Sequence, residues 1–505
     1  MDRPDKEIAA LRQRAQGLPR QHREAWAREQ LAQVDCGDLR RDQRLCSLLG
    51  AMIRQPGQSL PQQCESSAPL KATYRLLQGA HVQPHSIVQS AAQATTERLR
   101  RHHCPGVVLA VQDTTTTNFT THEAMEGRGP IGNSDKFRGF HVHTTLLLGE
   151  HEGVHGLQGC EIYARDGEAQ KARKPGERNR QSSQQKESHR WVRSVQDSAQ
   201  LCEELPQVEA VINIADREAD MYELLVEAQR LHEQHQGRFH LLVRAQHDRQ
   251  LQQDASESSD PVVRLWEHLE SQPAQVCWQI SMPAPKGIHG TQKRQVEALW
   301  IPVSLEVPAH QRKYKGHEQP VRVNIIMVRE PRPPEGQPAL EWVLLTTWPI
   351  SDVIELQRVV GWYARRWQIE VMHRVLKSGC KVESRRMQQA RSAQVMIVLD
   401  LLVAVRLMSL VSAARQEPEG PAGKWLSELE QEVLRAHFES VKTGTAGRPL
   451  SLGQAMRWIG QLAGHRGAPS SPPPGAEALW RGLTRLHDMT EGWRMAQASK
   501  NVGKS

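Results

Sequence analysis

Residues 359–378, VVGWYARRWQIEVMHRVLKS, show the period of an amphipathic helix. At about 100° per residue, one side collects four apolar positions, as a face packed on a core would: Ile369, Met372, Val375 and Leu376. The other side carries one carboxylate and four groups able to contact a polyanion: Tyr363, Arg366, Glu370, Arg374 and Lys377. We predict one helix that ends at Gly379. The alternative for its polar face is a solvated surface held by i, i+4 ion pairs.

Two apolar runs upstream each lead into an aspartate. The first run, VVLAVQ, has five apolar residues in six and precedes Asp113, and the second, VEAVINIA, precedes Asp216 in the string DREAD. Such runs predict strands buried on both faces, and α/β sheets carry their chemistry at the carboxyl ends of such strands. For Asp113 the alternative is a turn aspartate that bonds its own backbone. Further strands are predicted for FHVHTTLLLGE, GVHGLQGCEIYAR and GRFHLLVRAQH, the last containing Arg244.

The hydrophobic period and the composition of the chain change four times, which predicts an α/β protein whose core is interrupted by an insertion. In residues 1–100 the helical period dominates, and Arg40, Arg41 and Arg44 are candidates for clamping DNA, with a solvated face as the alternative. The predicted segments are a helical DNA-end-binding domain (1–100), the first part of the catalytic core (101–246), a β-rich insertion (247–340), the second part of the core (341–415) and a helical region expected to form dimer contacts (416–505). Within the core, polar residues 166–188 are predicted to be mobile.

Composition adds weaker constraints. The 505 residues carry a formal net charge of +8, which is compatible with a nucleic-acid partner without requiring one. The apolar segment near residues 391–416 is interrupted by Asp400 and Arg406, and the N-terminus lacks a signal-peptide pattern, so we expect no membrane span. The eight cysteines are scattered without a C-x-x-C pair, which indicates reduced thiols in a cytoplasmic protein and no structural zinc.

The polar face of the predicted helix also resembles a known signature. Tyr363, Arg366, Glu370 and Lys377 are separated by two, three and six residues, a spacing that resembles the Tyr-Arg-Glu-Lys signature of bacterial insertion-sequence transposases, specifically the insertion-sequence-four family. The contexts QDTTT and DREAD are similar to the surroundings of the two aspartates in that family. WAREQLAQVDCGDLRRDQRL and ATYRLLQ resemble its N-terminal DNA-recognition segment. The likeness covers roughly residues 25 to 412.

This resemblance implies an RNase H-like catalytic core, a mixed sheet with helices on its faces. It implies that Asp113, Asp216 and Glu370 bind two divalent ions, normally Mg²⁺ with Mn²⁺ able to substitute, for DNA cleavage and strand transfer. It further implies phosphate or DNA-end contacts from five side chains: Tyr363, Arg366, Arg374, Lys377 and Arg244. Trp342 would stack on a flipped base, or be a core tryptophan instead.

The expected protein is a homodimer on double-stranded transposon ends, cutting and pasting DNA, with a hairpin step implied by the family. Two other readings of the sequence remain: a catalytically inactive DNA-binding relative, and a metal-dependent nuclease that does not transpose.

Overall fold

A computed structural model describes most of residues 22–502. The description leaves out 65, 102–105, 133–135, 152, 167–186, 253–262, 284–290, 313, 315, 317–318, 440–448, 468–470 and 472. Nearly all of the segment predicted to be mobile, 166–188, lies outside the described residues. So does the first part of the region predicted to be helical, up to residue 21.

The described strands form one ten-stranded mixed sheet in the order β2-β3-β1-β5-β6-β10-β9-β8-β7, with β4 paired to β3. Strands β1, β5 and β6 are parallel, and the other pairings are antiparallel. The bounds are β1 (Val108–Asn118), β2 (Gly129–Pro130), β3 (Arg138–Gly149), β4 (Val154–Tyr163), β5 (Val211–Ala215), β6 (Phe239–Arg244), β7 (Val276–Pro283), β8 (Thr291–Leu305), β9 (Val321–Arg329) and β10 (Glu341–Thr346).

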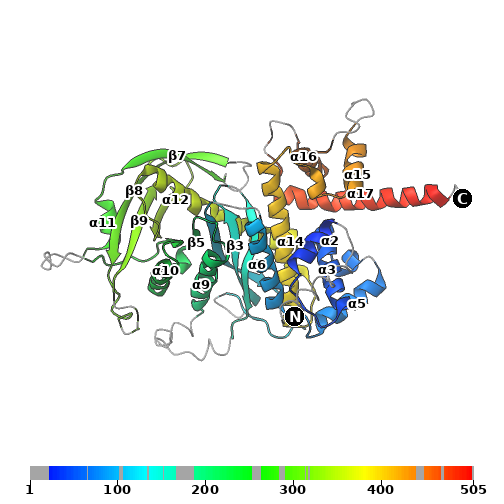
Figure 1. Ribbon diagram of the computed structural model, residues 1–505, viewed down its shortest axis with the longest axis horizontal. Coiled ribbons are helices and arrows are strands. Elements are labelled where there is room, and N and C mark those ends of the chain that lie inside the picture. The colour runs from blue at the N-terminus through cyan, green and yellow to red at the C-terminus, as the bar shows by residue number, and fades with distance from the viewer. Residues whose placement is uncertain are drawn as a thin grey trace, which may run out of the picture.

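Helices cover both faces of the sheet and form two further groups beside it (Figure 1). The N-terminal group is α2 (His22–Gln30), α3 (Leu39–Arg54), α4 (Leu60–Cys64), α5 (Ser67–Gln78) and α6 (Pro84–Arg101). The sheet is flanked by α9 (His189–Glu204), α10 (Tyr222–Gln234), α11 (Leu265–Glu270), α12 (Val353–Arg365), α13 (Trp367–Arg374) and α14 (Ala390–Gln416). The C-terminal group is α15 (Glu428–Phe438), α16 (Leu452–Leu462) and α17 (Ala476–Val502).

The large mixed sheet with flanking helices and a helical N-terminal region confirms the predicted α/β fold class. Helices α9 and α10 pack on β5 and β6, while α13 packs on β1 and α14 on β4. The strands predicted as a β-rich insertion extend this same sheet, because β9 pairs with β10 and β10 pairs with β6. The insertion therefore lengthens the core sheet at one edge, on the left in Figure 1.

Two predicted boundaries were wrong. The helix predicted over 359–378 begins earlier, where Asp352 caps α12 by accepting from the backbone N–H groups of Ile354 and Glu355. It then breaks at Arg366, resumes as α13 and ends in a π-helical turn, Val375–Gly379, closed by a 2.8 Å bond from the Cys380 N–H to the Val375 carbonyl. Strand β1 continues past Asp113 to Asn118, because its antiparallel pairing with β3 persists there.

Helix α14 is the apolar centre of the molecule. By length and composition it is the one described helix that passes the test for a membrane span, yet 78% of its most apolar window is buried inside the protein. Its Asp400 is almost fully buried and receives two hydrogen bonds from Arg385, at 2.8 and 2.7 Å. Arg385 also donates to the carbonyl of Gln58 and the side chain of Gln63, each at 3.2 Å. This buried ion pair therefore ties the N-terminal helices to the core.

Asp400→Asn should lower the free energy of unfolding by about 3 kcal/mol, because it leaves the Arg385 charge buried without its counter-ion. Lys424→Ala is the matched control, since the Lys424–Glu417 pair is largely exposed at 66% and 70%; it should cost less than about 1 kcal/mol. Urea unfolding of both variants measures the difference. Equal losses in the two variants would contradict the role given to the buried pair.

Candidate active site

The backbone brings the two strand aspartates to one edge of the sheet. In the parallel register of β1 and β5, Val111 pairs with Ile214, and Asp113 and Asp216 each lie two residues further along. Side chains two residues apart on a strand point to the same face. Helix α13 packs on β1 and carries Glu370, so three chain segments deliver the predicted carboxylates to one place.

The charges of the other two carboxylates both act on the pKa of Asp113. Burial raises the pKa of Asp113 to about 7, and the charge of Asp216 is the next largest cause, with Glu370 adding to it. The Arg366 guanidinium opposes this rise in pKa. Its Nη2 lies 2.6 Å from Glu370 Oε1 and its Nη1 lies 3.8 Å from Asp113 Oδ2. Arg366 thus lies between two of the three carboxylates and partly neutralises them.

A buried histidine that the sequence reasoning did not single out joins this cluster. His373 lies one turn after Glu370; its Nε2 is 2.8 Å from the Thr144 hydroxyl, and its Nδ1 is 4.0 Å from Asp113 Oδ2. Thr144 pairs directly with Asp113 across β1 and β3. Burial, together with Lys377 and Arg366, lowers the pKa of His373 to about 3, so the imidazole is neutral. The signal in the sequence was a histidine three residues after the glutamate, on the same side of the helix.

Asp220, the last residue of the DREAD string, was also missed. It is 1% exposed and accepts hydrogen bonds from the backbone N–H groups of Gln246 and His247, at 2.7 and 2.9 Å. It also pairs with Arg249. These contacts anchor the segment that follows β6, where Arg244 is located. Its location in the same motif as Asp216 was the available signal, but its role depends on a distant loop.

Arg244, Trp342 and Tyr363 form the flank of the cluster beside Asp216. Arg244 donates to the Glu341 carbonyl at 2.9 Å. Burial raises the pKa of the Tyr363 phenol; the charge of Arg244 opposes this rise and that of Asp216 adds to it. The rings of Trp342 and Tyr363 meet edge to face with centroids 5.1 Å apart, and they are 8% and 4% exposed. As placed, Trp342 is a packed strand residue, so base stacking stays a prediction.

The other predicted DNA-contacting residues lie further out. Arg374 is exposed on α13, and Lys377 is half-buried in the π-helical turn. Burial lowers the pKa of the Lys377 ammonium, and the charge of Glu383 opposes that shift. The three arginines at the start of α3 are separated from the sheet by α14 (Figure 1). Arg40 is exposed, Arg41 is half-buried and donates to the Cys36 carbonyl at 3.1 Å, and Arg44 is half-buried. The structure therefore does not bring these three to the carboxylates.

Two family models match the chain on either side of the first aspartate. The model described as "Transposase DNA-binding" matches residues 23–82, and the one described as "Transposase DDE domain" matches residues 161–406. The matches identify a transposase DNA-binding domain and a transposase DDE domain in this chain. The DDE match contains Asp216 and Glu370. Asp113 lies before it and is joined to the same site by the pairing of β1 with β5.

DDE transposase domains generally depend on divalent metal, and the donor set fits such an ion. Three carboxylates supply the oxygen ligands that Mg²⁺ and Mn²⁺ prefer. Burial raises the pKa of Asp113 most, and the charges of Asp216 and Glu370 raise it further, so a bound cation would relieve both effects. Across the described residues, however, no three acidic, histidine or cysteine side chains are gathered closely enough, as they stand, to ligate one ion. The Arg366 guanidinium occupies the space between Asp113 and Glu370.

Asp113→Asn should stabilise the metal-free protein at high pH. The pKa of Asp113 is raised from 3.8 to about 7, so the folded state binds the proton more tightly and its charged form costs stability as the pH rises between these values. In EDTA, the variant should gain at least about 1.4 kcal/mol more at pH 8 than at pH 4.5, the value of one pKa unit, because most of the shifted range lies between these two pH values. Urea unfolding at both pH values measures it, with Asp488→Asn, an exposed carboxylate on α17, as control. A gain that is independent of pH would contradict the prediction.

Proposed function

We propose that this protein is an active transposase that binds the ends of a mobile DNA element, cleaves them and joins them to target DNA. The observation that carries the proposal is the meeting of Asp113, Asp216 and Glu370 at one sheet edge, next to Arg366. A stable fold gains nothing from such like-charge proximity, so its value is functional. The DNA-binding match over residues 23–82 supplies the partner for that chemistry.

In this proposal Asp113, Asp216 and Glu370 hold two divalent ions, normally Mg²⁺ with Mn²⁺ able to substitute. Such ions would supply activation of the attacking oxygen and stabilisation of the leaving oxygen in an in-line phosphoryl transfer. Arg366 would have to leave Glu370 and Asp113 for them to bind. Its planar guanidinium then suits a DNA phosphate, which it can bind through two hydrogen bonds.

The remaining site residues grip DNA around the scissile phosphate. Arg374 is exposed for this role, while Lys377 and Arg244 are half-buried beside the cluster. Tyr363 is buried against Trp342, so contact of either side chain with DNA requires these rings to part. Base stacking by Trp342 is proposed on that condition. Arg40, Arg41 and Arg44 belong to the DNA-binding match and contact DNA further from the cut.

Finer features rest on the Tyr-Arg-Glu-Lys spacing. It supports membership of the insertion-sequence-four family and a cut-and-paste reaction through a hairpin, as in the transposase of the composite kanamycin-resistance transposon. A homodimer is supported by α17, which projects from the body of the molecule (Figure 1) and exposes Trp493 and Met495 by 37% and 71%. An inactive DNA-binding relative would bind ends without cutting. A simple nuclease would cut without joining.

The direct test incubates the purified protein with Mg²⁺ and DNA carrying the terminal repeats that flank its gene. Glu370→Ala should bind this DNA normally and lose cleavage by at least about a thousandfold, because the variant lacks a negatively charged ligand of the metal. Glu270→Ala, which removes an exposed carboxylate at the end of α11, should cut like the wild type. Wild-type protein that binds but never cuts would replace the proposal with the inactive relative.

We further infer that His373 positions Asp113. The Thr144 hydroxyl lies 2.8 Å from Nε2 and 3.5 Å from the Asp113 carbonyl oxygen; donation along the shorter contact leaves the imidazole proton on Nδ1, facing the Asp113 carboxylate. His373→Asn can keep an N–H near the Nδ1 position, whereas His373→Gln keeps only the group near Nε2 that meets Thr144. Asn should therefore need near-normal Mg²⁺ for half-maximal cleavage, and Gln should need about tenfold more, the usual cost of losing a ligand's supporting partner.

Calorimetric titration with Mn²⁺, without DNA, gives a readout of the same variants that does not depend on cleavage. It should show the same order of affinity, Asn above Gln. The reverse order in both measurements would mean that His373 only links α13 to β3 through Thr144.

A further inference from the structure

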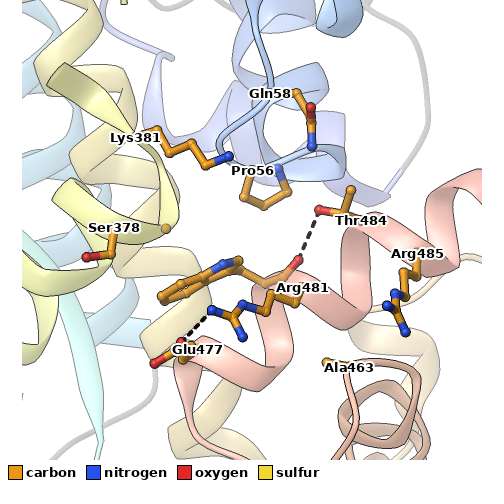
Figure 2. Close-up of a pocket in the computed structure, with 11 residues that line it drawn as sticks. Pro56, Gln58, Ser378, Lys381, Ala463, Glu477, Arg481, Thr484 and Arg485 are labelled. Carbon is orange, nitrogen blue, oxygen red and sulfur yellow. Dashed lines mark hydrogen bonds and ion pairs between the residues drawn. The ribbon is translucent and has the colours of Figure 1, made fainter. Parts of the chain in front are cut away.

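A hollow lined by several charged side chains lies where the N-terminal helices, the end of the glutamate-bearing helix and the C-terminal helix meet (Figure 2). Its volume is about 480 Å³. The turn after α3 contributes Pro56 and Gln58, and the segment after α13 contributes Ser378 and Lys381. Most of the remaining lining comes from the first turns of α17. We call this hollow the junction groove.

The walls of the junction groove are held by close backbone approach. Gly57 has a φ of +74°, and a Cβ built on it would lie 2.2 Å from the carbonyl oxygen of Gly379. A Cβ on Gly379 would in turn lie 2.8 Å from the ring of Trp480 on α17. No larger residue fits at either position without displacing a neighbour. The three segments that line the groove are therefore fixed relative to one another.

The groove is strongly cationic. Lys381, Arg481 and Arg485 line it and are exposed, against one acidic residue, Glu477. Among the described residues Lys381 has no carboxylate partner, and its backbone is left-handed with a φ of +51°, which is costly for a residue other than glycine. Arg481 pairs with Glu477 at 2.8 Å, but both side chains are about 60% exposed, so water already weakens that pair.

The neutral lining is also suited to an anion. Gln58 lines the groove and can donate through its amide, which points toward the other lining residues in Figure 2. Arg485 already donates one N–H to the Leu462 carbonyl, and a guanidinium has four others. In Figure 2 the end of the Lys381 side chain lies near Pro56, whereas the Arg481 guanidinium lies apart from it, beside Glu477. Cations spaced along a groove match a chain of phosphates better than they match one small anion.

We propose that the junction groove binds the phosphate backbone of the transposon-end DNA, so that α17 holds DNA as well as lying in the C-terminal region expected to dimerise. This inference rests on the proposed function. Its position supports DNA over an acidic protein: the groove begins at Ser378, the residue after Lys377 and eight beyond Glu370. A strand leaving the carboxylates along the glutamate-bearing helix meets Lys381 next, followed by the arginines of α17.

The test measures binding of end DNA by fluorescence anisotropy from about 50 to 300 mM NaCl. Lys381→Gln and Arg481→Gln should each weaken binding roughly threefold to tenfold near 0.1 M salt and reduce the slope of log K against log salt by about 0.9 per lost contact. Glu477→Gln removes the one acidic side chain among the described residues that line the groove, and it should tighten binding. That opposite sign cannot come from damage to the fold. Arg332→Gln, which removes an exposed charge from the loop after β9, is the matched control and should change neither quantity.

A second arm uses end DNA in which single phosphates are replaced by neutral methylphosphonates. At a phosphate held by Arg481, neutralisation should weaken the wild type but leave Arg481→Gln unaffected. Unchanged affinity and salt slope in both glutamine variants, with the wild type binding and cutting normally, would overturn the groove while leaving the proposed function intact. Tighter binding of an acidic peptide than of DNA to the groove, lost in the same variants, would also overturn it. A wild type that neither binds nor cuts ends would overturn both proposals.

Discussion

Repulsion among three carboxylates at one edge of the sheet is the constraint that the surrounding structure has to satisfy. Asp113 and Asp216 are brought together by the parallel pairing of β1 and β5, and Glu370 arrives on a helix packed against β1. Burial raises the pKa of Asp113 most, and repulsion from Asp216 and Glu370 raises it further. Arg366 offsets part of this rise, and neutral His373 adds no further charge. The three carboxylates therefore favour bound cations, and Arg366 occupies part of the space that such cations would take.

The same helix connects this cluster to the rest of the molecule. Beyond Glu370 it passes through the π-helical turn to Gly379, which touches both the turn after α3 and the Trp480 ring of α17. The buried Arg385–Asp400 pair fixes the N-terminal helices close to the same point. The DNA-binding region, the glutamate and the C-terminal helix therefore share one junction. If DNA bound to one of these parts moved, the packed backbone at the junction would transmit that movement to Glu370.

Much of the site could be predicted because its signals are local. Buried strands show as apolar runs, so Asp113 and Asp216 were marked by what precedes them, and the helical period placed Glu370 opposite a core face. The length of β1 was missed because its extension depends on pairing with β3, a distant partner. His373 gains its meaning only from Thr144 across the sheet. Trp348 is another such residue, because its indole donates to Glu355 at 2.8 Å and packs on the Trp362 ring. No local sequence pattern predicts these two contacts.

We propose that divalent metal replaces Arg366 as the cation bound by the three carboxylates when the protein binds and cleaves DNA. A crystal structure with transposon-end DNA and Mn²⁺, measured at a wavelength where manganese scatters anomalously, tests it most directly. The account predicts anomalous density in contact with Asp113, Asp216 and Glu370, with the Arg366 guanidinium moved onto a DNA phosphate. Arg366 still bridging Glu370 and Asp113 in crystals of a DNA-bound, cleavage-competent complex, with no manganese between the carboxylates, would contradict it.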